Sequence, residues 1–212
     1  PFLRIELSWL YYTYSKTMEY QKTLRTYWRE IILAGLILAN VFVWLRVSEE
    51  KLGPLKVFFL DVGQGDAIFA ETPSHKRMLL DGGPNKGVLA ELGKAMPFGA
   101  KNIDVMIESH PDKDHIGGLP EVVGRYNVGI FLEPGVESEN TIDDELHARV
   151  IEKQIPNILA RRGMIINFGD GVKLEILFPN QDVSRWETND ASIVAKLTYG
   201  EKSFLLTGDS PN

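Results

Sequence analysis

The 212-residue chain contains no cysteine. This absence excludes disulfide bridges and metal sites built from thiolates, and it leaves the redox compartment open. Any metal ion must therefore be held by histidine and carboxylate side chains, which suit zinc, manganese or iron in a catalytic site. The sequence also lacks an initiating methionine, since it starts at Pro1 and stops just after a strand-like run. We therefore expect a fragment of a longer protein.

Charge is absent from residues 31–45, an apolar run that predicts a transmembrane helix over residues 31–47. Aromatic residues lie near both ends of the run, and Arg29 and Arg46 bracket it, as is typical of helix ends at a membrane interface. A buried core helix is the alternative, because the uncharged stretch is short and contains Asn40. A cleavable signal peptide is not favoured, since the run lies deep in the chain and no cleavage pattern follows it.

Residues 1–30 are predicted to form a juxtamembrane segment before this helix. Four Lys or Arg residues lie between positions 16 and 29, and three follow the apolar run up to position 56. The positive-inside rule then places the N-terminal side in the cytoplasm and the later part of the chain outside the cell membrane. Residues 48–54 are predicted to be a linker.

Acidic residues outnumber basic residues in the rest of the chain. Residues 1–47 contain 6 Lys+Arg and 3 Asp+Glu, whereas residues 48–212 contain 17 Lys+Arg and 26 Asp+Glu. An acidic domain is untypical of a high-affinity nucleic-acid binder, which neutralises phosphate with clustered Lys and Arg. Bound divalent cations would reverse the local field, so the net charge does not exclude a phosphodiester substrate.

Helical and strand-like patterns alternate from residue 55 onward, which predicts one α/β (α+β) domain over residues 55–212. Two strands are expected within residues 56–72, on either side of a glycine-rich turn. Further expected elements are strands over Arg77–Leu80 and Ile103–Glu108, helices over Val88–Met96 and Ile142–Leu159, and hairpins that turn at residues 169–171 and 199–202. In the second helix, Ile158 fits the helical spacing of apolar residues, but Pro156 disturbs it.

Four potential metal ligands lie within six residues: His110, Asp112, Asp114 and His115. They follow the apolar strand 103–108 and precede Gly117-Gly118, where the backbone can turn sharply. Imidazole and carboxylate are the ligand types of a catalytic divalent metal with open coordination positions. The sequence therefore predicts a metal site in this loop.

A calcium loop of the EF-hand type does not fit this segment. With Asp112 as the first ligand, Ile116 falls where an oxygen ligand is needed, and Val123 falls where the bidentate glutamate belongs. A solvated polar turn does fit, because Asp and Lys favour turns through local hydrogen bonds. The loop alone favours a metal site over this turn but does not decide between them.

Three motifs carry a resemblance to known proteins. The loop from Ser109 to His115 resembles the His-x-His-x-Asp-His signature of the metallo-β-lactamase superfamily, with Asp112 in place of the second histidine. That replacement, together with the preceding Asp61-Val62-Gly63-Gln64-Gly65-Asp66, resembles the ComEC family of competence DNA-uptake proteins. The segment Leu206-Thr207-Gly208-Asp209 resembles the next metal motif of that family, and the resemblance covers about residues 55–212.

The resemblance implies a metallo-β-lactamase-like αββα sandwich, truncated at its C-terminus and preceded by the transmembrane helix, with residues 1–30 as the end of a membrane channel domain. It also implies two divalent metal ions, Zn or Mn. His110 and Asp112 would hold one ion, Asp114 and His115 the other, and Asp209 would bridge both. Asp114 would also be catalytic, by orienting the attacking water or taking its proton. Later histidines of the superfamily would lie beyond Asn212, so weak metal binding is expected from this chain alone.

Other polar residues are assigned to the surroundings of this site. The loop from Ser109 to His115 is called the metal loop below. The resemblance implies that Asp81 supports this loop, since metal sites commonly require such partners. It places Asp61, Gln64 and Asp66 in a loop beside the site, although a tight hairpin explains the same turn. Asn189 and Ser192 would contact metal-bound water or a substrate phosphate, and a cap at a strand start is the alternative. His75 and His147 have no partners at suitable spacing and are predicted to be surface histidines.

The function predicted from these features is a metal-dependent hydrolase of a ComEC-like membrane protein, a nuclease that acts on incoming DNA. DNA, the membrane and proteins of the competence machinery are the expected partners. Two alternatives stay open because one fold hosts many chemistries. The domain would be a membrane-tethered hydrolase of a substrate other than nucleic acid, or a catalytically silent structural part of a transporter.

Overall fold

The structure is a computed structural model that describes residues 7–48 and 53–211. The chain divides into two units, residues 1–51 and 52–212. The first six residues of the predicted juxtamembrane segment and residues 49–52 of the predicted linker lie outside the described residues.

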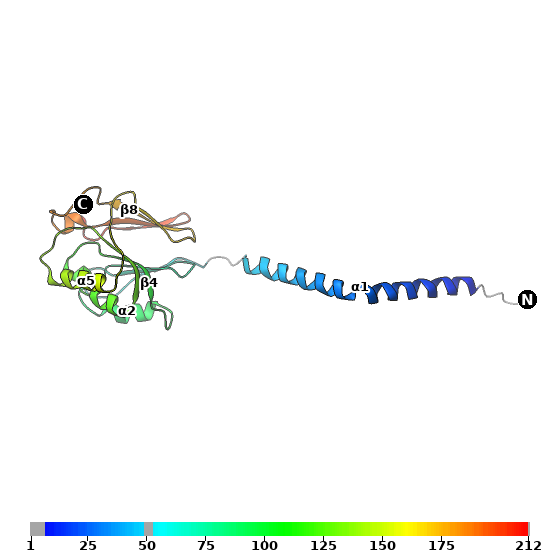
Figure 1. Cartoon of the computed structure of the whole chain (residues 1–212). Helices are drawn as coiled ribbons and strands as arrows, with labels where there is room; N and C mark the ends of the chain where they lie inside the picture. Colours follow the sequence, from blue (N-terminus) through cyan, green and yellow to red (C-terminus); the bar gives the residue numbers. More distant parts are fainter. Residues whose placement is uncertain (1–6, 49–52, 212) are drawn as a thin grey trace, which may run out of the picture. The chain divides into compact units, whose positions relative to one another are not determined.

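The first unit is one long helix, α1 (Leu7–Ser48), of 42 residues (Figure 1). The predicted transmembrane run 31–47 lies within α1, which continues without a break toward the N-terminus. Its stretch Thr26–Trp44 is long and apolar enough to cross a membrane, with a mean hydropathy of 1.4, and none of it is buried. Asn40 donates its side-chain amide to the Leu36 carbonyl at 3.0 Å. This polar side chain is therefore hydrogen-bonded within its own helix.

The second unit contains a six-stranded sheet in the order β1-β2-β3-β4-β5-β6. The pairs β1–β2 and β2–β3 are antiparallel, and β3, β4, β5 and β6 run parallel. The parallel strands therefore need crossover connections, which helices supply. The six strands are β1 (Lys56–Phe59), β2 (Ile68–Glu71), β3 (Arg77–Leu80), β4 (Asn102–Ile107), β5 (Asn127–Glu133) and β6 (Asn157–Leu159).

The crossover helices pack on one face of this sheet, and Figure 1 shows α2 and α5 together on that side of β4. Their contact surface is a core of fully buried side chains, among them Phe69, Leu79 and Phe131 from the strands and Leu92, Leu119 and Leu146 from the helices. Burial of apolar area is the main stabilising contribution in such a layer. The helices are α2 (Val88–Ala95), α3 (Lys113–Ile116), α4 (Leu119–Arg125) and α5 (Thr141–Glu152).

The other face of the six-stranded sheet packs against a second, antiparallel sheet in the order β10-β9-β8-β7. Both predicted hairpins are present: β7 (Ile165–Asn167) with β8 (Val172–Phe178), and β9 (Val194–Tyr199) with β10 (Lys202–Leu206). Along β8, Val172 and Leu174 are buried in the shared core, while Lys173 and Glu175 on the outer face are exposed. No helix within residues 53–211 covers that outer face, so three layers of the expected four-layer sandwich are seen in this range.

The predicted helix over Ile142–Leu159 is wrong in its second half. Helix α5 ends early, and Asn157–Leu159 form strand β6. Gln154 has a positive φ of 55°, and Pro156 has no N–H for a helical hydrogen bond and disfavours a helical conformation in the residue before it. Ile158, which fitted the helical spacing, belongs to the strand instead.

His147 is half-buried between two carboxylates, whereas the sequence predicts a surface histidine without partners. Its Nε2 lies 3.0 Å from Glu133 Oε2, and its Nδ1 lies 3.0 Å from Asp143 Oδ1. Hydrogen bonds with Asp143 and Glu133 raise the pKa of His147 to about 11, and its ring packs edge-on against Phe131. His147 is therefore a cation that joins α5 to β5, whereas His75 is exposed as predicted.

We expect His147→Gln to lower the free energy of unfolding by about 2 kcal/mol at pH 6, because hydrogen bonds to charged groups typically contribute that much. The pKa of His147 rises from its ordinary value of 6.5 to about 11 in the fold. The contribution of the charge is therefore full below pH 6.5 and is lost as the pH rises toward 11. Urea denaturation of the detergent-solubilised chain at pH 6, 8 and 10 measures both effects.

His75→Gln is the matched control, because that histidine has 72% of its side chain exposed and should change stability little. An equal loss in both variants, or a loss that grows with pH, would contradict the assigned role of His147.

Candidate metal centre

The candidate centre lies at the carboxyl ends of the parallel strands. Asp81 directly follows β3, and Ser109-His110 follow β4 after one intervening residue. In open α/β sheets this edge is where ligands bind, because the chain leaves the strands there in loops. His115 lies on the short helix α3, and Asp209 follows β10. Both sheets therefore contribute residues to one place.

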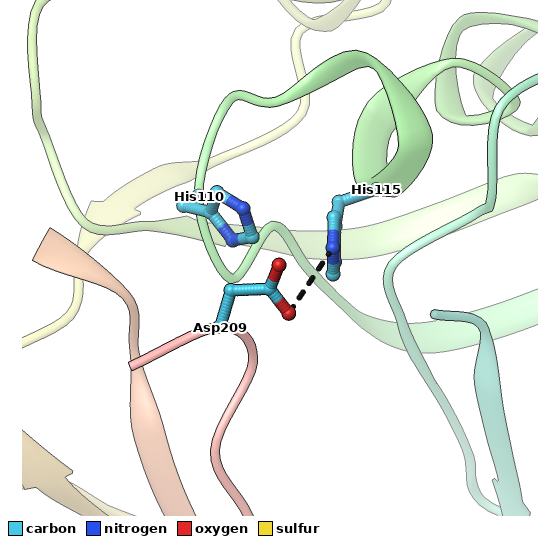
Figure 2. Close-up of side chains that lie close together, drawn as sticks. All are labelled: His110, His115 and Asp209. Carbon is cyan, nitrogen blue, oxygen red and sulfur yellow. Dashed lines mark ion pairs between the residues drawn. The ribbon is translucent and has the colours of Figure 1, made fainter. Parts of the chain in front are cut away.

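His110, His115 and Asp209 are the one group of potential metal ligands found among the described residues. One ligand atom from each lies within 4.8 Å of the others. The two imidazole centroids are 4.1 Å apart, and His115 Nε2 lies 3.5 Å from Asp209 Oδ1. Figure 2 shows Asp209 beneath the two rings, with its carboxylate directed between them. Both histidines are buried and Asp209 is half exposed, so the group opens to solvent on the Asp209 side.

The fully buried carboxylate of Asp81 holds the histidines from behind. Its Oδ1 accepts the Ser109 backbone N–H at 2.8 Å, and its Oδ2 accepts the Ser109 hydroxyl at 2.6 Å. The same Oδ2 lies 2.9 Å from His115 Nδ1, and Ser109 Oγ lies 3.0 Å from His110 Nδ1. Each imidazole therefore has a partner at Nδ1, which leaves Nε2 available at the centre. Metal-binding histidines commonly have this arrangement.

The two histidines differ in their electrostatics. Burial lowers the pKa of His115, but the hydrogen bond and charge of Asp81, followed by the charges of Asp209 and Asp114, raise it to about 9. Burial and the positive charge of His115 lower the pKa of His110. The centre therefore combines a cationic imidazole with a neutral one, and metal binding would displace the proton of His115.

The residues present fit a bound divalent metal. His110 Nε2 is buried and makes no hydrogen bond, a state that is costly unless a ligand completes it. Two imidazoles and a carboxylate with one solvent-facing side match a catalytic site, which keeps an open coordination position.

The structure places Asp112 and Asp114 beside this group rather than in it. Asp112 is the N-cap residue of α3, and its Oδ2 lies 3.7 Å from His110 Nε2. Asp114 is half-buried on α3, and its charge helps to raise the pKa of His115. Both carboxylates lie close to the histidines, but the assignment of each to a particular ion stays a prediction.

The glycine-rich turn of residues 61–66 packs against the metal loop. Gly65 has a φ of +62°, and a Cβ at that position would overlap the carbonyl oxygen of Asp114. The Asp66 carbonyl accepts the Gly83 N–H at 2.9 Å. Burial raises the pKa of the Asp66 carboxyl, His115 lowers it, and the charge of Asp81 raises it further. Asp66 therefore lies within electrostatic range of the centre.

Asp61 and Gln64 of the same turn are exposed. A hydrogen bond with Glu91 and the charge of Glu91 raise the pKa of Lys94 on α2, and the charge of Asp61 adds a smaller contribution in the same direction. The turn thus brings Asp66 toward the centre, whereas Asp61 lies within range of the helix layer. The turn joins the antiparallel strands β1 and β2, as the hairpin alternative expects, and its Gly65 also packs against the metal loop.

Asn189 and Ser192 take different positions. Ser192 is fully buried, and its Oγ has no hydrogen-bond partner. The next residue, Ile193, donates its N–H to the Ser109 carbonyl at 2.9 Å, so Ser192 lies directly behind the metal loop. Asn189 is exposed in the short 3-10 helix η1 (Asn189–Ala191), and its carbonyl accepts the Ser192 N–H at 3.1 Å. This contact uses the backbone of Asn189 and not its side chain, so both alternatives for Asn189 stay predictions.

Sequence reasoning missed Asn140, which connects the metal loop to α5. Its Nδ2 donates to the Pro111 carbonyl at 2.8 Å, while its Oδ1 accepts the Ile142 N–H at 3.1 Å as the N-cap of α5. An Asn just before a helical pattern is an N-cap signal, but the bond to Pro111 has no local signal.

Sequence reasoning also missed Glu108. This residue is buried beside the metal loop with no partner for Oε2, and burial raises its pKa well above the ordinary value.

Residues 60–210 match the family described as the metallo-β-lactamase superfamily. The chain belongs to the metallo-β-lactamase superfamily. The matched range includes Asp81, His110, His115 and Asp209, so the whole candidate centre lies within it. The predicted metallo-β-lactamase fold, a mixed α/β domain with two packed sheets, is confirmed.

The resemblance to the ComEC family is also confirmed. The chain is 26% identical over 197 residues to ComE operon protein 3 of Bacillus subtilis (strain 168), covering 85% of this chain and 25% of that protein. It is 27% identical over 186 residues to Competence protein ComA of Neisseria gonorrhoeae, covering 86% and 23%. The chain therefore spans about a quarter of the length of these curated relatives.

Among solved structures, the chain is similar to CmlA, a diiron β-hydroxylase from Streptomyces venezuelae. The TM-score is 0.46 at 19% sequence identity, and the similarity covers 74% of this chain and 30% of CmlA.

We expect Asp81→Asn to weaken the binding of Mn²⁺ or Zn²⁺ by roughly 10- to 100-fold, as is usual when a partner of a ligating histidine is lost. The asparagine keeps the size of the side chain but removes the charge and one acceptor. Isothermal titration calorimetry of the detergent-solubilised chain measures the affinity. Asp61→Asn is the control, because Asp61 is exposed, and equal weakening by both variants would refute the role of Asp81.

Gly65→Ala and Gly63→Ala form a second matched pair. Both glycines have positive φ, but the Cβ of the first would overlap the metal loop, whereas nothing lies within 4 Å of the second. The left-handed conformation alone should cost about 1–2 kcal/mol in each variant, and the overlap should cost Gly65→Ala about 1–3 kcal/mol more. Urea denaturation measures the difference in the free energy of unfolding. Equal stabilities of the two variants would show that close packing of Gly65 does not position the metal loop.

Proposed function

We propose that this domain is a metal-dependent nuclease that cleaves phosphodiester bonds of DNA during uptake across the cell membrane. The convergence of His110, His115 and Asp209, with Asp81 behind them, is the observation that carries this proposal. The names of the curated relatives, a ComE operon protein and a competence protein, supply the context of DNA uptake. The superfamily fold itself indicates a hydrolase.

Two divalent ions are the proposed cofactors, Zn or Mn. His110 and Asp112 would hold one ion and Asp114 and His115 the other, with Asp209 shared between them. Asp112 makes the first set richer in oxygen than an all-histidine set, which shifts the preference toward Mn. When bound, such ions supply Lewis-acid polarisation of a phosphoryl oxygen and lower the pKa of water.

Three carboxylate side chains have separate proposed roles in the reaction. Asp81 fixes the imidazole of His115 so that Nε2 stays directed at the centre. Asp114 is half-buried beside His115 and would accept the proton of the attacking water. Asp209 lies on the exposed side, where substrate would approach. The acidic surroundings disfavour a polyanion until cations are bound, so metal binding would precede DNA binding.

The proposal also includes a membrane location. The curated relatives are ComEC-family proteins, and helix α1 contains one stretch long and apolar enough to span a bilayer, Thr26–Trp44. The distribution of Lys and Arg around it would place the hydrolase domain on the extracytoplasmic side. Transient contact with DNA and with other proteins of the competence machinery follows from that location.

The test uses the protein as its gene encodes it, purified in detergent and supplied with Mn²⁺ or Zn²⁺, on single- and double-stranded DNA. We expect metal-dependent cleavage that falls by at least about 100-fold in Asp114→Asn, because general acid–base catalysis contributes about that much. His115→Ala should lose activity through lost metal. Glu175→Gln, on the exposed outer face of β8, is the control and should retain full activity.

Three outcomes would contradict the proposal. Cleavage that survives Asp114→Asn and His115→Ala would come from a contaminating nuclease. Hydrolysis of a thioester or lactone without DNA cleavage would show a different substrate class. Metal binding without any hydrolysis would show a structural domain.

A further inference from the structure

The two edges of the six-stranded sheet differ in chemistry. β1, β3, β4 and β5 run in the same direction, so their N-terminal ends lie on the same side of the sheet. This side, formed by strand ends and not by an edge strand, is here called the N-terminal edge. The candidate metal centre follows the ends of β3 and β4 at the opposite edge. The six residues of β4 separate the two edges by about 20 Å. Any function of the N-terminal edge is therefore separate from the metal centre.

The loop between α2 and β4 presents an unpartnered aromatic side chain at the N-terminal edge. Phe98 is fully exposed, at 108% of its reference area. It lies beside a cavity of about 230 Å³ whose floor includes the buried Met96 and Tyr126. A fully exposed Phe next to an apolar hollow leaves apolar area in contact with water, and this area is available for contact with something else.

The charge around this loop is the reverse of the domain's charge. Lys101 and Arg125 line the same cavity, which has no carboxylate in its lining. Both cations are exposed, and neither has an ion-pair partner among the described residues. Residues 48–212 as a whole contain 26 Asp+Glu against 17 Lys+Arg. An aromatic side chain flanked by two free cations therefore lies on a domain of net negative charge.

The chain itself indicates which surface lies within reach. The apolar stretch of α1 ends at Trp44, and the first sheet strand is preceded by Leu55 at the N-terminal edge. The residues between them can extend at most about 40 Å. The headgroups of a bilayer that holds α1 would therefore be within reach of the N-terminal edge. Anionic headgroups attract free Lys and Arg, and aromatic rings insert at the interface.

We propose that Phe98, Lys101 and Arg125 dock the hydrolase domain on an anionic phospholipid surface. This inference rests on the proposed membrane attachment of the chain. Phe98 enters the headgroup region, and the two cations bind lipid phosphates on either side of it. Docking at the N-terminal edge leaves the metal centre on the side of the domain that faces away from the lipid.

The absence of cysteine allows a direct test by site-directed spin labelling. The 212-residue chain with Phe98→Cys, labelled with a nitroxide, is reconstituted into vesicles of phosphatidylcholine and phosphatidylglycerol at 3:1. Glu139→Cys, an exposed position at the opposite edge, is the matched control. We expect the label at position 98 to collide more with oxygen, which concentrates in lipid, than with a water-soluble nickel complex. The label at position 139 should show the reverse.

Two charge variants test the recognition of anionic lipid. Lys101→Gln with Arg125→Gln should lower the ratio of docked to free domain roughly 30-fold, because each such cation is attracted to anionic lipid. Lys173→Gln with Lys196→Gln removes two exposed cations from the outer face of the second sheet and should change nothing. Vesicles of phosphatidylcholine alone should reproduce the first result.

Carbonate extraction of the same vesicles separates the two proposals. If carbonate releases the chain, the membrane attachment itself fails. If the chain stays in the vesicles and the label at position 98 is as accessible to nickel as the label at position 139, only the docking proposal fails. A label at position 98 that neither reagent reaches would show burial against protein, such as a second copy of the chain, and would also overturn lipid docking.

Discussion

The hydrogen bonds of the Asp81 carboxylate are the constraint on which the rest of the site depends. A fully buried carboxylate must be matched by donors, or its burial costs several kcal/mol. The Ser109 amide, the Ser109 hydroxyl and the imidazole of His115 supply those donors. Asp81 itself is held at the end of β3 by its own N–H, which donates to the Ile107 carbonyl of β4 at 2.9 Å. Two neighbouring strands thus determine where the metal loop lies.

Close backbone contact is the second requirement. The segment after β3 and the segment after α3 touch through glycines, with the Gly118 N–H donating to the Gly83 carbonyl at 3.1 Å. A side chain at Gly117 or Gly118 would overlap carbonyl oxygens of the facing segment. At the other side, Gly208 has a φ of +50° and packs on Ser109, which brings Asp209 to the histidines. The glycines of the motifs are therefore needed for close backbone packing as well as for the turns of the chain.

Much of the fold and part of the centre follow from local sequence. The bounds of β3 and the turns of both hairpins match the pattern of apolar residues and glycines, because strand periodicity and turn chemistry act over a few residues. The helix over residues 142–159 was overextended, since Ile158 suits either a helix face or the short strand β6. His147 was missed as an ion-paired cation because its partner Glu133 comes from another element, and spacing along the chain carries no sign of that contact.

By itself, the sequence determined the candidate ligand types, the apolar segment and the superfamily, because these depend on residue identity and spacing within short motifs. The tertiary structure decided which of the candidates meet. It brought His110, His115 and Asp209 together, placed Asp112 and Asp114 beside them, left Asp61, Gln64 and Asn189 exposed, and buried Ser192 behind the loop. The reason is that Asp209 lies more than ninety residues from His115 along the chain. Only the packing of one sheet on the other brings them within contact distance.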